Sequence, residues 1–156
     1  MKQPGSPGDL AQKTAAHRLL QSGVGLFLLG LLTGFAIPVL ANPRMGLSSH
    51  LEGVMNGMFL VLLGLIWERL ALPSTALRVA FWLAIYGTFA NWATTLLAAF
   101  WGAGESMMPI AAQGHNGTSV QEMIVSIGLW SLSVSMVVVC VLVLWGLRRP
   151  PSSARE

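Results

Sequence analysis

Residues 50–58 hold three polar side chains in an otherwise apolar stretch: His50, Glu52 and Asn56. Ionisable side chains inside a membrane helix are energetically costly, and they mark functional sites by default. At about 100° per residue, Glu52 and Asn56 share one face of a helix, whereas His50 shares another face with Gly53. A helix here would therefore present a histidine to one neighbour and a Glu/Asn pair to another.

His50 has two interpretations. Neutral imidazole is the commonest metal-binding side chain, which makes His50 a candidate ligand for haem iron. Alternatively, it is a histidine near the lipid headgroups that hydrogen-bonds to water or to a neighbouring helix. Zinc is disfavoured because zinc sites need three or four His, Cys or carboxylate ligands. The other histidines, His17 and His115, belong to different parts of the chain.

A second polar set lies in the apolar stretch 77–103. Asn91 and Thr95 are one helical turn apart, so both can face one cavity, and Tyr86 and Thr94 lie nearby. A buried amide needs hydrogen-bond partners or a ligand. Asn91 is therefore either a site residue or a partner in an interhelical hydrogen bond.

These side chains must be positioned by four apolar stretches, at about residues 19–41, 50–72, 77–103 and 120–147. A bilayer core needs about 20 apolar residues per helix. Only 10% of the residues are charged, against about 25% in soluble domains. We predict an all-α integral membrane protein, with an up-down-up-down four-helix bundle at 17–149, a disordered cytoplasmic tail at 1–16 and a cytoplasmic tail at 150–156.

The basic residues predict the orientation of this bundle. Eight of the nine Lys and Arg residues flank the helix ends on one side, and they are Lys2, Lys13, Arg18, Arg69, Arg78, Arg148, Arg149 and Arg155. Loops rich in Lys and Arg stay in the cytoplasm. Both termini are therefore predicted to be cytoplasmic, in a multi-pass protein of the bacterial inner membrane. Basic residues at the ends of apolar runs do not indicate nucleic-acid binding.

Local signals predict helix ends and contacts. The Asn-Pro-Arg sequence at 42–44 is predicted to end the first helix, and Ser74 or Thr75 to cap the third. Thr-Ser at 118–119 followed by Glu122 resembles a capping box.

Other residues predict how the helices pack. Gly53 and Gly57 have the four-residue spacing that lets membrane helices approach closely, although glycine is also simply common in such helices. Trp92 and Trp130 lie deep in their stretches and are candidates to line an aromatic pocket.

Four segments strongly resemble hydroxylaminobenzene mutases: TGFAIP at 33–38, NPRMGL at 42–47, SHLEG at 49–53 and MNGMF at 55–59. The resemblance covers the four stretches, roughly residues 17–147. That family rearranges hydroxylaminobenzene to 2-aminophenol in bacterial nitroarene degradation. The resemblance therefore implies a membrane-bound isomerase that acts on small aromatic hydroxylamines.

A more distant similarity is to styrene oxide isomerase. It rests on His50 followed by Asn56-Gly57-Met58, and on the pair Ala90-Asn91. That family is a trimer of four-helix subunits that binds haem b through this histidine at a subunit interface. The similarity implies His50 as the axial ligand of haem b, Asn56 as a pocket residue and a homo-oligomer, a trimer. The isomerase has a functional tyrosine where this chain has Thr95, so that role is not carried over.

The sequence thus predicts Asn56, Glu52 and Asn91 as catalytic residues, with His50 holding haem iron as a Lewis acid. The amides would orient the hydroxylamine and Glu52 would move a proton. Two other functions stay open. A non-enzymatic haem or quinone anchor subunit with bis-His haem would need a second intramembrane histidine. A small transporter usually carries a glutamate at the centre of the membrane, whereas Glu52 lies near a helix end.

Overall fold

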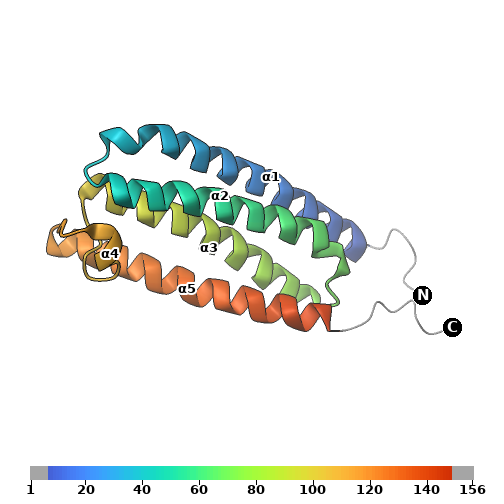
Figure 1. Cartoon of the computed structure of the whole chain (residues 1–156). Helices are drawn as coiled ribbons and strands as arrows, with labels where there is room; N and C mark the ends of the chain where they lie inside the picture. Colours follow the sequence, from blue (N-terminus) through green and yellow to red (C-terminus); the bar gives the residue numbers. More distant parts are fainter. Residues whose placement is uncertain (1–6, 149–156) are drawn as a thin grey trace.

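The computed structural model describes residues 7–148, which are built from helices without strands (Figure 1). The elements are α1 (Pro7–Ala36), η1 (Ile37–Val39), α2 (Pro43–Ile66), η2 (Trp67–Arg69), α3 (Ser74–Trp101), α4 (Pro109–Ala112) and α5 (Ser119–Leu147). Four of them are long and apolar enough to cross a membrane, which confirms the predicted all-α fold with four membrane-length helices. The predicted tail at 150–156 and the first part of the predicted tail at 1–16, residues 1–6, lie outside the described residues.

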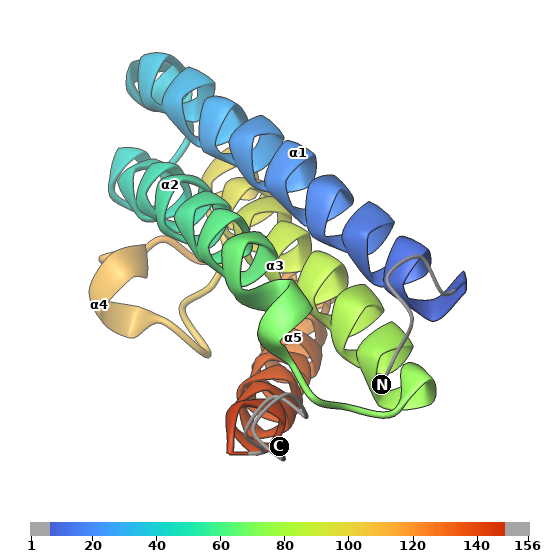
Figure 2. The same cartoon turned by 90° about the vertical axis from the view of Figure 1, so that its right-hand side faces the viewer.

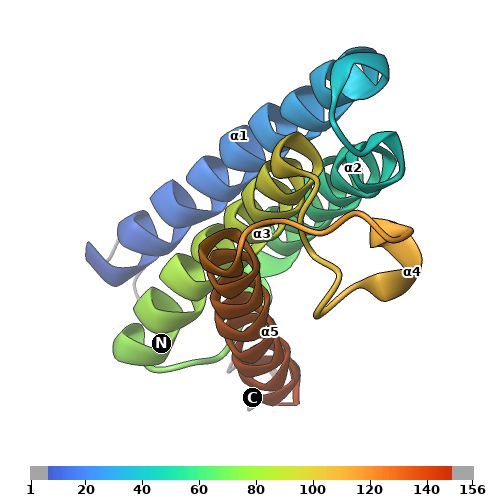
Figure 3. The same cartoon turned by 90° about the vertical axis from the view of Figure 1, so that its left-hand side faces the viewer.

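The long helices form an open array. Consecutive long helices run in opposite directions, and α1 and α5 lie on opposite sides of α3 (Figure 2 and Figure 3). α1 packs along α2, α2 packs along α3, and α5 packs mainly along α3. Unlike the fourth helix of a square bundle, α5 therefore does not close against α1, and large apolar side chains along it remain exposed.

The Asn-Pro-Arg sequence at 42–44 begins α2, so the prediction that it ends the first helix was wrong. The Asn42 side chain accepts a hydrogen bond of 3.0 Å from the Met45 backbone N–H, as an N-cap does. Pro43 occupies the first turn, where its missing N–H costs nothing. α1 instead ends at Ala36 and continues as the short turn η1, which contains Pro38.

The other helix starts also differ from the prediction. α1 begins at Pro7, so residues 7–16 are helical, and Gln12 connects them to η2 by donating to the Trp67 carbonyl oxygen at 2.8 Å. Pro73 stands at the start of α3 without a side-chain cap, in place of Ser74 or Thr75.

The capping box of α5 pairs Thr118 with Gln121 and leaves out Glu122. Glu122 serves the preceding loop instead, because its carboxylate accepts from the Gly104 N–H at 2.7 Å and from the Gly117 N–H at 3.2 Å.

Glycines bring the backbones of α1 and α2 together, as the spacing of Gly53 and Gly57 predicted. A Cβ atom on Gly53 would lie 2.5 Å from the Cα of Gly30, and one on Gly57 would lie 2.6 Å from the backbone nitrogen of Phe27. Backbone atoms at such distances cannot move aside as a flexible side chain can. The two helices therefore approach closely only because these positions carry no side chain.

We expect Gly53→Ala to lower the thermal unfolding temperature of the purified protein in detergent. The added methyl group overpacks the contact with Gly30, at a cost of about 1–3 kcal/mol. Gly25→Ala is the matched control, since a Cβ there meets nothing within 4 Å. Equal unfolding temperatures for the two variants would contradict the glycine contact.

Candidate active site

The Glu52 carboxylate joins α2 to α3 through two amides. Its Oε2 atom accepts a hydrogen bond of 3.0 Å from Asn56 Nδ2 and one of 2.6 Å from Asn91 Nδ2. Glu52 and Asn56 are four residues apart on α2, so they share a face, as predicted. The prediction that Glu52 lies near a helix end was wrong, because α2 begins at Pro43 and Glu52 lies near its middle. Asn91 reaches them from α3. The structure thus brings together the three side chains predicted to be catalytic, here termed the Glu52 cluster, and their catalytic roles remain a prediction.

The two amides stabilise a charged group that is costly to bury. A carboxylate can only accept hydrogen bonds, so both amides turn their NH₂ groups toward it and leave their carbonyl oxygens for other partners. Both donate to Oε2, and within residues 7–148 no group donates to Oε1. Asn56 is buried, whereas Glu52 and Asn91 are half-buried. The cluster therefore offers one free carboxylate oxygen and two amide oxygens to a ligand.

His50 points to the other side of α2, toward α1. Its Nδ1 lies 2.8 Å from the carbonyl oxygen of Gly30. Because a carbonyl can only accept, Nδ1 carries the proton and Nε2 keeps its lone pair. The ring packs so closely on Gly34 that a Cβ there would lie 2.9 Å from Nδ1. Metal-binding histidines usually donate their second N–H to a carbonyl in this way, so His50 fits the predicted haem ligand.

Within one chain, His50 does not join the Glu52 cluster. The imidazole hydrogen-bonds to α1, whereas the carboxylate bonds to α3. This separation follows the two helical faces predicted from the sequence. An active site that uses both the imidazole and the carboxylate would therefore need a surface from outside this chain, placed beside His50 or beside the Glu52 cluster.

Trp92 of α3 connects α1 and α2 by hydrogen bonds near the Glu52 cluster. Its indole N–H donates to the Thr33 hydroxyl on α1 at 3.0 Å, and the Ser49 hydroxyl on α2 donates to the Trp92 carbonyl oxygen at 3.1 Å. The edge of the indole packs on Gly53. Trp92 is therefore a packing junction. Trp130 points outward from α5 with 65% of its surface exposed, so the two do not line one pocket.

Sequence reasoning missed Thr33 and Ser49, since single hydroxyl residues in membrane helices give no periodic signal. It also left Thr95 and Tyr86 open. The Thr95 hydroxyl donates to the backbone carbonyl oxygen of Asn91 at 2.8 Å, within its own helix. Tyr86 hydrogen-bonds to Ser131 of α5 at 2.7 Å. Within the described residues, neither Thr95 nor Tyr86 hydrogen-bonds to a side chain of the Glu52 cluster.

Four membrane-length helices, two of which hold a carboxylate–amide cluster, indicate a multi-pass membrane protein with a polar site between its helices. The chain belongs to the styrene oxide isomerase family, whose model matches residues 15–148. The protein is therefore an isomerase, which sets aside the anchor subunit and the transporter.

Two relatives narrow the comparison. The chain is 64% identical over 137 residues to hydroxylaminobenzene mutase HabB of Ectopseudomonas oleovorans, which covers 88% of this chain and 84% of the relative. It is 47% identical over 131 residues to hydroxylaminobenzene mutase HabA of the same organism, covering 84% and 97%. No solved structure matches the chain at a significant level. The similarity to hydroxylaminobenzene mutases expected from the sequence is thus confirmed.

We expect Asn91→Ala to destabilise the folded protein by about 1–3 kcal/mol, because Glu52 loses a donor in a region with little water. The measurement is thermal unfolding in detergent. Asn116→Ala is the control, since Asn116 is exposed and bonds only within its loop. Unchanged stability of Asn91→Ala would show that the carboxylate does not depend on this amide.

Proposed function

We propose that this protein rearranges hydroxylaminobenzene, or a closely related aryl hydroxylamine, to 2-aminophenol. The Glu52 cluster is the observation that carries the proposal, because it holds a carboxylate with a free oxygen inside a membrane-length helix. Support also comes from the mutases that resemble the chain over most of its length. The reaction moves the hydroxyl group from nitrogen to the ortho carbon of the ring, with no net oxidation.

The proton balance defines the role of Glu52. Nitrogen loses the hydroxyl group and gains a proton, while the ortho carbon gains the hydroxyl group and loses a proton. One base that accepts the carbon-bound proton and returns it to nitrogen is sufficient. Oε1 of Glu52 is available for this transfer, since the amides occupy Oε2.

Asn56 and Asn91 orient the substrate. Their carbonyl oxygens are free to accept hydrogen bonds from the N–H and O–H of a hydroxylamine. Their NH₂ groups meanwhile hold the carboxylate in one rotamer. A substrate held in reacting geometry needs less activation entropy, and small misplacements are costly in rate. The same two residues therefore position both the base and the hydroxylamine.

The proposal includes haem b bound through Nε2 of His50. Gly30 fixes the tautomer that leaves this atom free, and a Cβ-free position at Gly34 makes room for the ring. When bound, the haem would supply a Lewis acid at the N–O group, which lowers the barrier to breaking that bond. His50 would contribute the ligand and its orientation, and the Glu52 cluster would contribute the proton transfer.

We also propose a homo-oligomer, specifically a trimer, in the bacterial inner membrane. His50 and the Glu52 cluster face different neighbours, so a second copy packed beside one chain supplies the missing half of the site. Both termini face the cytoplasm in this proposal, because the helix ends on their side carry most of the Lys and Arg residues.

Separate replacements of His50 and Asn56 should distinguish haem binding from substrate positioning. His50→Ala should abolish both the Soret absorbance and the conversion of hydroxylaminobenzene, with helical content unchanged. Asn56→Ala should keep the Soret band but lower kcat roughly a hundredfold. His115→Ala is the control, since its imidazole makes the same kind of bond to a carbonyl, that of Ala112, within a loop. Wild-type protein without haem, after expression with ample haem supply, would overturn the haem part alone.

Mixing inactive subunits should test the shared site. Co-expression of equal amounts of His50→Ala and Asn56→Ala chains should restore about a quarter of wild-type activity if each site takes one residue from each of two neighbours. Random mixing pairs an intact His50 with an intact Asn56 at that frequency. Activity no higher than that of the separate variants would place the whole site within one chain.

A further inference from the structure

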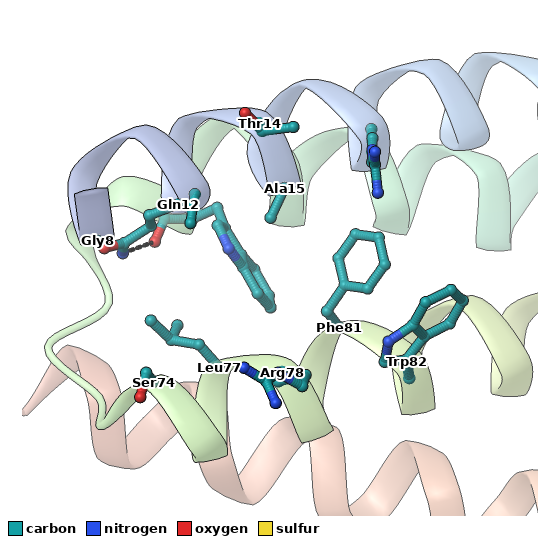
Figure 4. A pocket seen from close by; sticks show the side chains of 12 residues that line it. Gly8, Gln12, Thr14, Ala15, Ser74, Leu77, Arg78, Phe81 and Trp82 are labelled. Atoms are coloured by element: carbon teal, nitrogen blue, oxygen red, sulfur yellow. Dashed lines mark hydrogen bonds between the residues drawn. The ribbon is translucent and has the colours of Figure 1, made fainter.

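A cavity of about 410 Å³ opens at the end of the molecule where α1 begins and α2 turns into α3. It lies between α1 and α3, far from the Glu52 cluster. Figure 4 shows Phe81 and Trp82 on α3 below Ala15 on α1, with Arg78 beside them. Its polar and aromatic lining includes Gln12, Arg18, Arg78, Trp67, Phe81 and Trp82.

The lining of this cavity has a net positive charge. Arg18 comes from α1 and Arg78 from α3, and no acidic residue is among the lining side chains of the described chain. Arginine presents several N–H donors in a planar fork that suits phosphate oxygens. Two arginines from facing helices, without a carboxylate between them, therefore fit an anionic phosphate group.

The buried indole of Trp67 has an N–H group without a hydrogen-bond acceptor among the described residues. Only 1% of the surface of Trp67 is exposed. Buried N–H groups in proteins are nearly always paired. A donor left over in a wall of this cavity is what a ligand with acceptor oxygens would use.

The cavity continues along the groove between α1 and α3. A neighbouring hollow of about 220 Å³ shares Arg18, Phe81 and Trp82 with it and extends to Ile85. Ile85 lies about 6 Å further along α3 than Phe81, toward the middle of the span. In the deeper part of the groove, Phe81, Trp82 and Ile85 form the apolar wall on α3, and Gln21 and Ser22 lie opposite them on α1.

We propose that this groove binds an anionic phospholipid, with the phosphate between Arg18 and Arg78 and an acyl chain along Phe81 and Ile85. The site lies where the interface of a membrane meets the helix ends, and tryptophans such as Trp82 are typical of that depth. Juxtamembrane arginines attract anionic lipids electrostatically. The proposal does not depend on the proposed reaction, because Trp67, which directly follows α2, lies about 22 Å from Glu52 along the helix axis.

Native mass spectrometry of the purified full chain in detergent tests the proposal. Wild-type protein titrated with phosphatidylglycerol should retain lipid, and it should retain much less phosphatidylcholine of the same chain length. The double variant R18Q/R78Q should bind phosphatidylglycerol roughly thirtyfold more weakly, since each arginine contributes about a fivefold preference. R44Q is the matched control, because Arg44 is exposed and lies at the start of α2, away from the cavity.

Three results would overturn the lipid site. They are equal retention of the two lipids, undiminished phosphatidylglycerol binding by R18Q/R78Q, and displacement of the lipid by inorganic phosphate at matching concentrations. The last would identify a site for free phosphate. R18Q/R78Q should keep wild-type turnover of hydroxylaminobenzene in detergent and an unchanged circular dichroism spectrum. If it unfolds, the single variants R18Q and R78Q decide, each with about a fivefold loss expected.

Discussion

The close contact between α1 and α2 sets the direction of every polar side chain in the site. Gly53 meets Gly30 at a distance that excludes any side chain, so α2 has one rotational setting against α1. In that setting His50 reaches the Gly30 carbonyl oxygen. The opposite face of the same helix then carries Glu52 toward α3. The contact between Gly53 and Gly30 has no reactive group, but it sets the direction of both the His50 imidazole and the Glu52 carboxylate.

The cost of a carboxylate in lipid explains how α3 is attached. Lipid offers no hydrogen-bond donors, so Glu52 must find them in protein. Asn56 supplies one from its own helix and Asn91 supplies one from α3. The hydrogen bond between Trp92 and Thr33 adds a second fixed point between α3 and α1. The groups that make the site chemically capable are therefore also groups that hold three helices in register.

The long helices and their polar faces could be predicted from the sequence. The helix start at Pro43 and the packing of α5 on α3 could not. The pairing of Glu52 with Asn56 and the separation of His50 follow from the helical repeat, and the close glycine contact follows from residue spacing. Pro43 was misread because proline is typical both after the end of a helix and in the first turn of the next, and the Asn42 cap shows that it begins α2. The docking of α5 on α3 left no signal, since its apolar residues surround the helix on all sides.

An open array of four helices limits what one chain can enclose. The cavities of about 410, 220 and 290 Å³ are lined by none of His50, Glu52, Asn56 or Asn91. The rearrangement that we propose passes through an electron-poor ring, and it would need a wall that keeps bulk water away from the intermediate. With α5 placed against α3, the chain has no further long helix among its described residues to build that wall. In the oligomer that we propose, a second copy would supply this wall and bring an imidazole to a carboxylate–amide cluster, so that assembly and catalysis would share one structural requirement.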